Sequence, residues 1–381
     1  MKTPVQIVVQ PFLDNSYWIN DIIVGIKSIC DTINYYPRVI IDENINFSEM
    51  GLNNSCVIVV GYDVSWLHKT INSLQKICCK TIVVNSWVSE DLLKSNNAVY
   101  FTLDSIIEQA CTYLSMNKRE KTVLFGINER SLADFIKKDT FIQLNKSLKK
   151  GDVKVYSFKD SLSKSLNDFL QDFSEGNIDS VICANDTIAI CLQNMLKKEG
   201  FKIPEDLFVI GMGNSELGKY VSPSITTFEF DYFELGKQTF WLWKSLIKDD
   251  KDTHREVKLI CPFIIRESTE NLIYTEKDQD RLEHQNLKMV IENDMNAYFE
   301  DETIKTVINF ETFFRSCDKQ DISILKGIVK NKNYNLISES LFMTDRAIRY
   351  RINKMNKKLG ISTREEMVKM IKSFNIFEDE E

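Results

Sequence analysis

The chain has 381 residues, of which 43% are hydrophobic and 27% are charged, and its formal net charge is -7. A chain of this length holds two or three domains, and this composition is typical of a globular protein in water. No stretch approaches the ~20 consecutive apolar residues of a transmembrane helix, so we expect no membrane partner.

Cysteine and histidine usage predicts a cytoplasmic protein without a metal site. The nine cysteines are odd in number, form no C-x-x-C pair and lie mostly in apolar runs, which predicts reduced and buried thiols. The first residues lead directly into the strand-like run Val5–Val9, which leaves no room for a signal peptide. None of the three histidines lies near a cysteine cluster, so we expect neither a metal ion nor another cofactor.

From Val5 to about Ile265, short apolar runs alternate with helical stretches such as Trp18–Thr32, Asp104–Met116 and Thr187–Glu199. The predicted strands are Val5–Val9, Val39–Ile41, Cys56–Val60, Thr81–Val84, Val99–Thr102, Thr122–Phe125, Lys154–Ser157, Ser180–Cys183, Phe208–Ile210 and Thr226–Phe230. Nearly continuous apolar strands between helices indicate parallel sheets covered on both faces. The length of this region favours two doubly wound α/β lobes over one.

The most specific part of this region runs from Val181 to Gly236. It contains Ile182-Cys183-Ala184-Asn185-Asp186-Thr187-Ile188-Ala189, Ile203-Pro204-Glu205-Asp206-Leu207-Phe208-Val209-Ile210-Gly211, Ser222-Pro223-Ser224-Ile225-Thr226-Thr227 and Glu234-Leu235-Gly236. These motifs resemble the effector-binding core of the LacI/GalR regulators, which are related to periplasmic sugar-binding proteins. The later run Phe263-Ile264-Ile265-Arg266-Glu267-Ser268-Thr269 matches the last strand of that family.

This resemblance implies an effector-binding domain over residues 1–270, built as a two-lobed, periplasmic-binding-protein-like fold. Segments near Phe101–Asp104, near Phe228–Asp231 and beyond Leu246 would cross between the lobes, and the ligand would lie in the cleft. The residues that match effector-contact positions are Tyr17, Trp18, Asp104, Lys137, Asn185, Asp186 and Asn214.

Two of these assignments have equally simple structural alternatives. Trp18, beside Tyr17, can stack on a sugar or base ring, or it can pack into its own lobe at the start of a helix. Asn185 and Asp186 can contact a ligand, cap the following helix, or do both.

The sequence also departs from the family at ligand-contact positions. Lys137 stands where the family has Arg, and Thr140 replaces the Gly before Phe141. Gly213, followed by Asn214, replaces an Asp that often binds ligand hydroxyls. Because that carboxylate is missing, we expect the cleft to bind a ligand other than an ordinary sugar, or to bind no ligand.

A connector over residues 271–317 follows the two-lobed domain. After a polar start, two apolar stripes recur at helical spacing. The first stripe is Leu287, Val290, Ile291, Met295 and Tyr298, and the second is Ile304, Val307, Ile308 and Phe314. These helices either form a dimer or pack against the sensor.

The segment from Asn333 to Ile361 predicts two helices joined by a three-residue turn. Asn333 and Thr344 are suitable N-caps, and Gly360 is suited to the left-handed end of the second helix. Apolar residues recur along each helix, as Leu336, Ile337 and Leu341 and as Ile348, Ile352, Met355 and Leu359. Ser362 and Glu365 fit a capping box for a further helix.

Charge is unevenly distributed along the chain. Residues 318–374 hold 13 Lys and Arg against 6 Asp and Glu, a net charge of +7. The acidic tail, residues 375–381, carries four acidic side chains. A basic module on an acidic body suits DNA binding through counterion release, although an ordinary amphipathic hairpin with a solvated face has the same pattern.

The runs Ile324–Ile328, Leu336–Thr344 and Lys357–Ile361 resemble the LuxR-type helix-turn-helix, which implies an all-α DNA-binding domain over residues 318–374. The Thr and His of that family's recognition helix are Ala347 and Arg351 here, so the resemblance leaves the operator open. The residues expected to contact DNA are Thr344, Arg346, Arg349, Tyr350, Arg351, Lys354 and Lys358.

The leading hypothesis is therefore a cytoplasmic transcription regulator that binds double-stranded DNA as a homodimer and responds to a small-molecule effector. A second hypothesis keeps the DNA binding but gives the sensor a ligand-free role in dimerisation or protein docking. A third, a solute receptor, conflicts with the predicted absence of an export signal. No P-loop, G-x-G-x-x-G or G-x-S-x-G motif is present, so we do not expect an enzyme.

Overall fold

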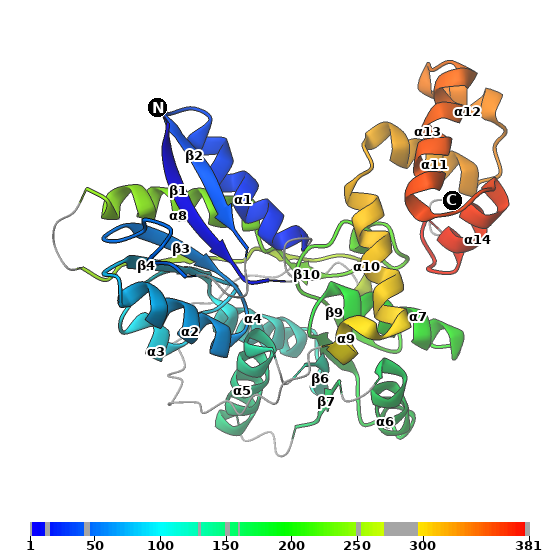
Figure 1. Ribbon diagram of the computed structural model, residues 1–381. Coiled ribbons are helices and arrows are strands. Elements are labelled where there is room, and N and C mark those ends of the chain that lie inside the picture. The colour runs from blue at the N-terminus through cyan, green and yellow to red at the C-terminus, as the bar shows by residue number, and fades with distance from the viewer. Residues whose placement is uncertain are drawn as a thin grey trace.

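The computed structural model describes residues 2–11, 16–41, 46–128, 131–148, 153–158, 161–248, 253–269 and 296–377. Two α/β lobes form the body, and a group of short helices follows on the side of the second lobe (Figure 1). The predicted connector stripe from Leu287 to Met295 and the last four acidic residues lie outside the described residues.

The first lobe is a parallel six-stranded sheet in the order β11-β5-β4-β3-β1-β2. Its strands are β1 (Thr3–Val9), β2 (Tyr35–Ile40), β3 (Cys56–Val60), β4 (Lys80–Val84), β5 (Asn97–Phe101) and β11 (Glu256–Leu259). Its helices are α1 (Tyr17–Cys30), α2 (Val64–Gln75), α3 (Glu90–Leu93) and α8 (Tyr232–Leu246).

Both faces of this sheet are buried, as the nearly continuous apolar strands predict. Along β1, Ile7 belongs to the cluster that contains α1 and α8, whereas Val8 belongs to the cluster on the α2 side. Helices α1 and α8 cross closely at Gly25 and Gly236, because a Cβ atom on Gly236 would lie 2.1 Å from the carbonyl oxygen of Ile22. Small residues at this crossing therefore allow the two helix backbones to lie in direct contact.

The second lobe is a parallel four-stranded sheet in the order β7-β6-β8-β9. Its strands are β6 (Thr122–Ile127), β7 (Val155–Ser157), β8 (Ser180–Cys183) and β9 (Phe208–Ile210). Its helices are α4 (Leu103–Met116), α5 (Leu132–Ser147), α6 (Leu162–Ser174), α7 (Asp186–Lys198), η1 (Leu217–Lys219) and η2 (Glu267–Thr269). The antiparallel pair β10 (Thr227–Phe228) and β12 (Phe263–Ile264) lies in the segments that join the lobes.

The C-terminal helices are α9 (Asn296–Glu300), α10 (Glu302–Arg315), α11 (Lys319–Val329), α12 (Tyr334–Leu341), α13 (Asp345–Leu359) and α14 (Arg364–Lys372). We call α11 to α14 the helical module. Residues 375–377 return to the second lobe, where Ser222 donates its backbone N–H to Asn375 (2.9 Å) and Phe377 donates to Tyr220 (3.0 Å). The first three residues of the expected tail, 375–377, are therefore bound to the second lobe.

Several predicted element boundaries are wrong. Strand β11 was not predicted, because exposed Glu256 and Lys258 interrupt its apolar pattern at the edge of the sheet. Strand β2 begins at Tyr35 rather than Val39. The strand predicted over residues 226–230 is only the two-residue β10, which pairs with the two residues of β12.

Two details of the helical module also differ from the prediction. The capping box of α14 is Thr363 with Glu366, one residue later than predicted, since the extended Thr363 accepts the Glu366 N–H. Leu336, expected on an apolar face, is exposed, while Ile337 of the same helix is buried. The caps at Asn333 and Thr344 and the left-handed Gly360 are confirmed.

All nine cysteines are free, and six of them are buried, as the apolar runs predict, whereas Cys78 is exposed. Within the described ranges, no helix is long and apolar enough to cross a membrane. The same residues contain no group of three or more His, Cys, Asp or Glu side chains placed to hold a metal ion.

Candidate effector cleft and DNA interface

The expected effector residues lie at the carboxyl ends of the parallel strands in both lobes. Asn185 and Asp186 directly follow β8, and Asn214 follows β9. Tyr17 and Trp18 open α1 after β1, and Asp104 lies in the first turn of α4, although its side chain is outside the described part of the structure. This edge is where open α/β sheets bind ligands.

Asp186 is 2% exposed, and both of its carboxylate oxygens are hydrogen-bonded. One oxygen accepts the Ser215 backbone N–H (2.6 Å), and the other accepts the Thr227 hydroxyl (2.6 Å). Burial raises the pKa of Asp186 to about 6, because the loss of hydration outweighs these two stabilising bonds. Gly211 makes room for the carboxylate, since a Cβ atom there would lie 2.2 Å from it.

Asn185 has two partners within its own chain. Its side-chain oxygen accepts the Ile188 N–H (2.9 Å), which caps α7, and its amide donates to the Tyr298 hydroxyl of α9 (3.0 Å). The buried Tyr298 ring packs edge-on against Phe158, with 5.3 Å between the ring centroids. The amide therefore caps a helix and binds the connector.

Lys137 and Asn214 are likewise bonded inside the protein. The buried Lys137 ammonium donates to Asp134 (2.8 Å) and to the carbonyl oxygen of Ala184 (2.7 Å), next to Asn185. The Asn214 amide donates to Glu229 (3.1 Å), and its oxygen accepts from Arg266 (2.5 Å).

The two aromatic candidates meet on one partner. The rings of Tyr17 and Trp18 lie 6.5 and 5.8 Å from the ring of Tyr232, and the Tyr232 hydroxyl is 3.1 Å from that of Ser86. Trp18 is half-buried and Tyr17 is more exposed. The structure thus brings Tyr17 and Trp18 together through Tyr232.

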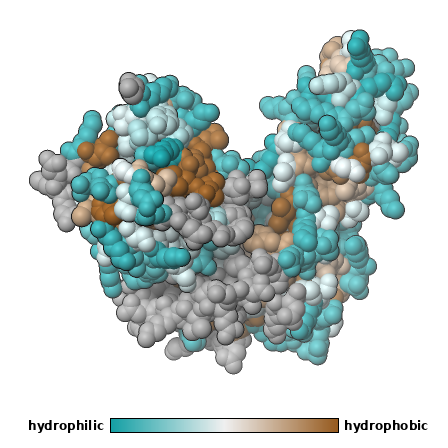
Figure 2. Space-filling model, viewed as in Figure 1, coloured by the Kyte–Doolittle hydropathy of each residue, from teal (hydrophilic) through white to brown (hydrophobic). Residues whose placement is uncertain are grey.

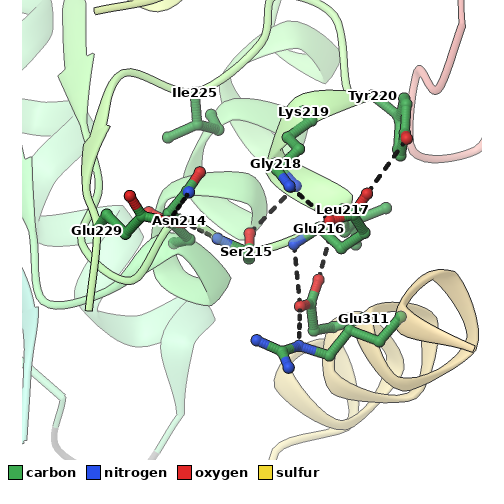
Figure 3. Close-up of polar contacts among 12 residues, drawn as sticks. Asn214, Ser215, Glu216, Leu217, Gly218, Lys219, Tyr220, Ile225, Glu229 and Glu311 are labelled. Carbon is green, nitrogen blue, oxygen red and sulfur yellow. Dashed lines mark hydrogen bonds and ion pairs between the residues drawn. The ribbon is translucent and has the colours of Figure 1, made fainter. Parts of the chain in front are cut away.

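Two connector residues that were not predicted as site residues reach this region. The Glu311 carboxylate, 6% exposed, accepts the backbone N–H groups of Glu216 (3.0 Å) and Leu217 (2.8 Å) (Figure 3). Arg315 donates to Glu311 (2.9 Å) and to Asp21 of α1 (2.9 Å). The only hint in the sequence is the spacing of Glu311 and Arg315, four residues apart on one helix.

The expected DNA interface is the helix pair α12 and α13. Ile348, Ile352 and Met355 are buried on one side of α13, and Thr344 accepts the Ala347 N–H at the helix start. The turn between the helices contains Phe342, which is left-handed and 98% exposed.

Five of the expected DNA contacts are exposed on α13, namely Arg346, Arg349, Tyr350, Lys354 and Lys358. The Arg349 side chain donates to Asp345 one helical turn earlier (2.7 Å) and lies over the Tyr334 ring (4.8 Å). The surface of the helical module in the view of Figure 2 is mostly hydrophilic.

Arg351, which is partly buried, and Lys358, which is exposed, each contact another part of the protein. Arg351 forms ion pairs with Asp318 (2.8 Å) and Asp321 (2.7 Å) at the start of α11, and its side chain is 25% exposed. The Lys358 ammonium lies 3.5 Å from the Ser316 carbonyl oxygen, beside a cavity of about 640 Å³ between α10 and the helical module.

Part of the two-lobed body is similar in sequence to known proteins. Residues 152–269 match the family described as periplasmic binding protein-like domain. The transcriptional repressor PurR of Vibrio atlanticus is 41% identical over 90 residues, 24% of this chain and 27% of the relative. The ribose operon repressor of Haemophilus influenzae is 32% identical over 93 residues, 24% of this chain and 28% of the relative. The match thus spans about a quarter of either relative's length.

Solved structures extend the likeness to both lobes. A LacI family transcriptional regulator from Enterococcus faecium with bound ribose has a TM-score of 0.57 at 19% identity, over 70% of this chain and all of that one. The lac repressor dimer bound to its operator has a TM-score of 0.56 at 16% identity, over 71% of this chain and 82% of that one. The two-lobed body therefore has the periplasmic-binding-protein-like fold of the LacI-family regulators.

Proposed function

We propose that the protein is a DNA-binding transcription regulator, with a LacI-like body and a C-terminal helix-turn-helix of the LuxR type. The observation that carries the proposal is the exposed face of α13, where Arg346, Arg349, Tyr350 and Lys354 lie opposite the buried Ile348 side. A helix of this kind fits the major groove, where Arg and Lys donate to guanine and to phosphates. The net charge of +7 over residues 318–374 supports the same assignment.

The contacts divide the seven expected DNA residues into groups with different roles. Arg346, Arg349, Tyr350 and Lys354 are proposed to touch DNA, and Thr344 positions them by capping α13. Arg351, paired with Asp318 and Asp321, is proposed to hold α13 on α11. Lys358, beside Ser316, is proposed to face α10 rather than the duplex.

Selection of duplexes from a random pool by the full-length protein tests this proposal. The variant Arg346/Arg349/Lys354→Ala should lose about 100-fold or more in affinity for the selected site, since each lost contact costs about 1–3 kcal/mol. The matched control, Lys319/Lys332/Lys369→Ala, removes the same charge from exposed positions outside α13. It should weaken binding to the selected site and to unrelated duplexes by the same small factor. Equal losses in the two variants would contradict the assignment of α13 as the reading helix.

We further propose that the cleft between the lobes is the sensor. Relatives of this body include a ribose operon repressor and a regulator with bound ribose, which makes sugars and related metabolites the first effectors to test. Thermal unfolding with ribose, glucose, sucrose, lactose, nucleosides and amino acids is the experiment. A true effector at ~100 times its dissociation constant should add about 2.7 kcal/mol of stability.

A second candidate function has its own support. The polar side chains expected to bind an effector, Lys137, Asn185, Asp186 and Asn214, all have partners inside the chain. In this candidate the body takes no small molecule and serves dimerisation or protein docking. Absence of any stabilising compound, together with normal regulation by Trp18→Ala, would favour it over the sensor.

A further inference from the structure

Helix α10 touches the first lobe, the second lobe and the helical module. We propose that α10 is a strap, whose C-terminal end ties the first lobe to a unit made of the second lobe and the helical module. The strap would thereby regulate where the DNA-binding helix lies relative to the first lobe. This regulatory use rests on the proposed function, whereas the mechanical strap does not.

The attachment of α10 to the second lobe is extensive and buried. Phe310 and Phe314 on its apolar face are almost fully buried, and the Phe314 ring lies 5.5 Å from that of Tyr220. Glu311 adds the two backbone hydrogen bonds to Glu216 and Leu217. A buried carboxylate with two N–H donors is costly to remove, so this end of the contact is firm.

The helical module is attached to α10 and, through the residues that follow α14, to the second lobe itself. Phe310 lies 4.9 Å, ring to ring, from Phe374 just after α14, and Lys358 approaches the end of α10 at Ser316. Beyond α14, residues 375–377 bind residues 220–222 of the second lobe. These attachments are continuous, because the Phe377 ring also packs near the rings of Phe314 and Tyr220, and together they fix the module to the second lobe.

The attachment to the first lobe is of a different kind. Arg315 pairs with Asp21 at 2.9 Å, and its guanidinium lies 4.3 Å above the Tyr17 ring. The side chains of Arg315 and Asp21 are 33% and 37% exposed, and ion pairs so open to solvent are weak. Arg315 also donates to Glu311 through a different nitrogen, so it can release Asp21 and stay on α10.

The shape of the molecule leaves room for this release. Figure 2 shows the surface hollowed between the first lobe and the helical module, with a hydrophobic patch over α1 facing the hollow. If the first lobe rotates about the segments that contain β10 and β12, the contacts of Arg315 with Asp21 and with Tyr17 must open. The second lobe and the module would move together.

Amide hydrogen exchange on the full-length protein tests the strap with Asp21→Lys, which places a cation against Arg315. Exchange in the first turns of α1 and at residues 313–317 should rise about 10-fold or more, with a smaller rise in Asp21→Asn. The control is Asp31→Lys, the same charge change at the exposed far end of α1. Unchanged exchange in β3 and β8 establishes that each variant is folded. Equal exchange in Asp21→Lys and Asp31→Lys would overturn the strap.

DNA binding by the same variants separates the strap from the function on which its regulatory use rests. Release of the strap should change affinity for the selected duplex about five-fold or more, in the range of ordinary coupling between sites. Faster exchange in Asp21→Lys with unchanged DNA affinity would overturn the regulatory use. If the unmodified protein selects no DNA, the proposed function fails, and the exchange comparison still decides the strap.

Discussion

The Tyr298 hydroxyl of α9 lies 3.0 Å from the side-chain amide of Asn185, at the carboxyl end of β8. This contact places the connector against the edge of the second lobe where an effector was expected. The sequence left open whether the connector pairs two protomers or packs on the two-lobed domain, and the described helices α9 and α10 pack on its second lobe.

Docking of α9 predicts different effects for two neighbouring aromatics. Tyr298→Ala should lower the free energy of unfolding by about 3–5 kcal/mol, because it leaves a cavity beside Phe158. Phe299→Ala, at an exposed position, should change it by about 0.5 kcal/mol or less. Thermal and urea unfolding measure both, and equal effects would show that α9 is not docked in solution.

Removal of the Glu311 carboxylate should leave two backbone N–H groups without their acceptor. We expect Glu311→Ala to lower the free energy of unfolding by about 1–3 kcal/mol. Glu302→Ala, on the same helix but with a largely exposed side chain, is the control and should cost much less. A Glu311→Ala variant as stable as Glu302→Ala would contradict the firm attachment of α10.

Asp186 predicts a specific dependence of stability on pH. Its pKa of about 6 in the folded protein lies above the ordinary value of 3.8, so the protonated form is favoured by folding. The contribution is fully present below about pH 4 and is lost as pH rises through about 6, a total of roughly 3 kcal/mol. Relative to Asp186→Asn, which cannot titrate, the free energy of unfolding should fall by most of that amount between pH 4 and pH 7. A constant difference over this range would show that Asp186 has no raised pKa.

Arg351 and Arg346 on the same helix should behave differently. Arg351→Ala breaks both ion pairs to α11 and should destabilise the helical module by about 1–2 kcal/mol, since the side chain is mostly covered. Arg346→Ala should leave stability within about 0.5 kcal/mol and reduce DNA affinity. Calorimetry together with a DNA titration separates the two effects. A stability loss in Arg346→Ala and an affinity loss in Arg351→Ala would contradict both assignments.

The proposed homodimer predicts the salt dependence of DNA binding. One helical module should neutralise about 3–5 phosphates, which corresponds to a log–log salt slope of roughly -3 to -4.5, and two modules should double it. A two-fold dimer would also read an inverted repeat with half-sites about one helical turn apart. Sedimentation with a labelled duplex at several salt concentrations measures stoichiometry and slope. A one-protein complex with the shallow slope would exclude the dimer.

Local signals in the sequence determined much of the fold. Apolar strands such as Cys56–Val60 and Ser180–Cys183 were located to the residue, because both faces of a parallel strand are buried and its side chains are apolar throughout. The caps at Asn333 and Thr344 were equally readable, since capping depends on one side chain and the next turn of backbone. Edge strand β11 was not predicted because one of its faces is exposed to solvent, and the charged residues on that face interrupt its apolar pattern.

The arrangement of the candidate sites was decided by tertiary structure. A basic residue on a helix has the same local pattern whether it faces solvent or a neighbouring helix, so Arg351 could not be told from Arg346 until α11 placed Asp318 and Asp321 beside it. The partners of Asn185 and Asp21 lie 113 and 294 residues away, on α9 and α10. Contacts over such separations depend on how two lobes and a connector pack, and that packing is set by the whole chain rather than by any short motif.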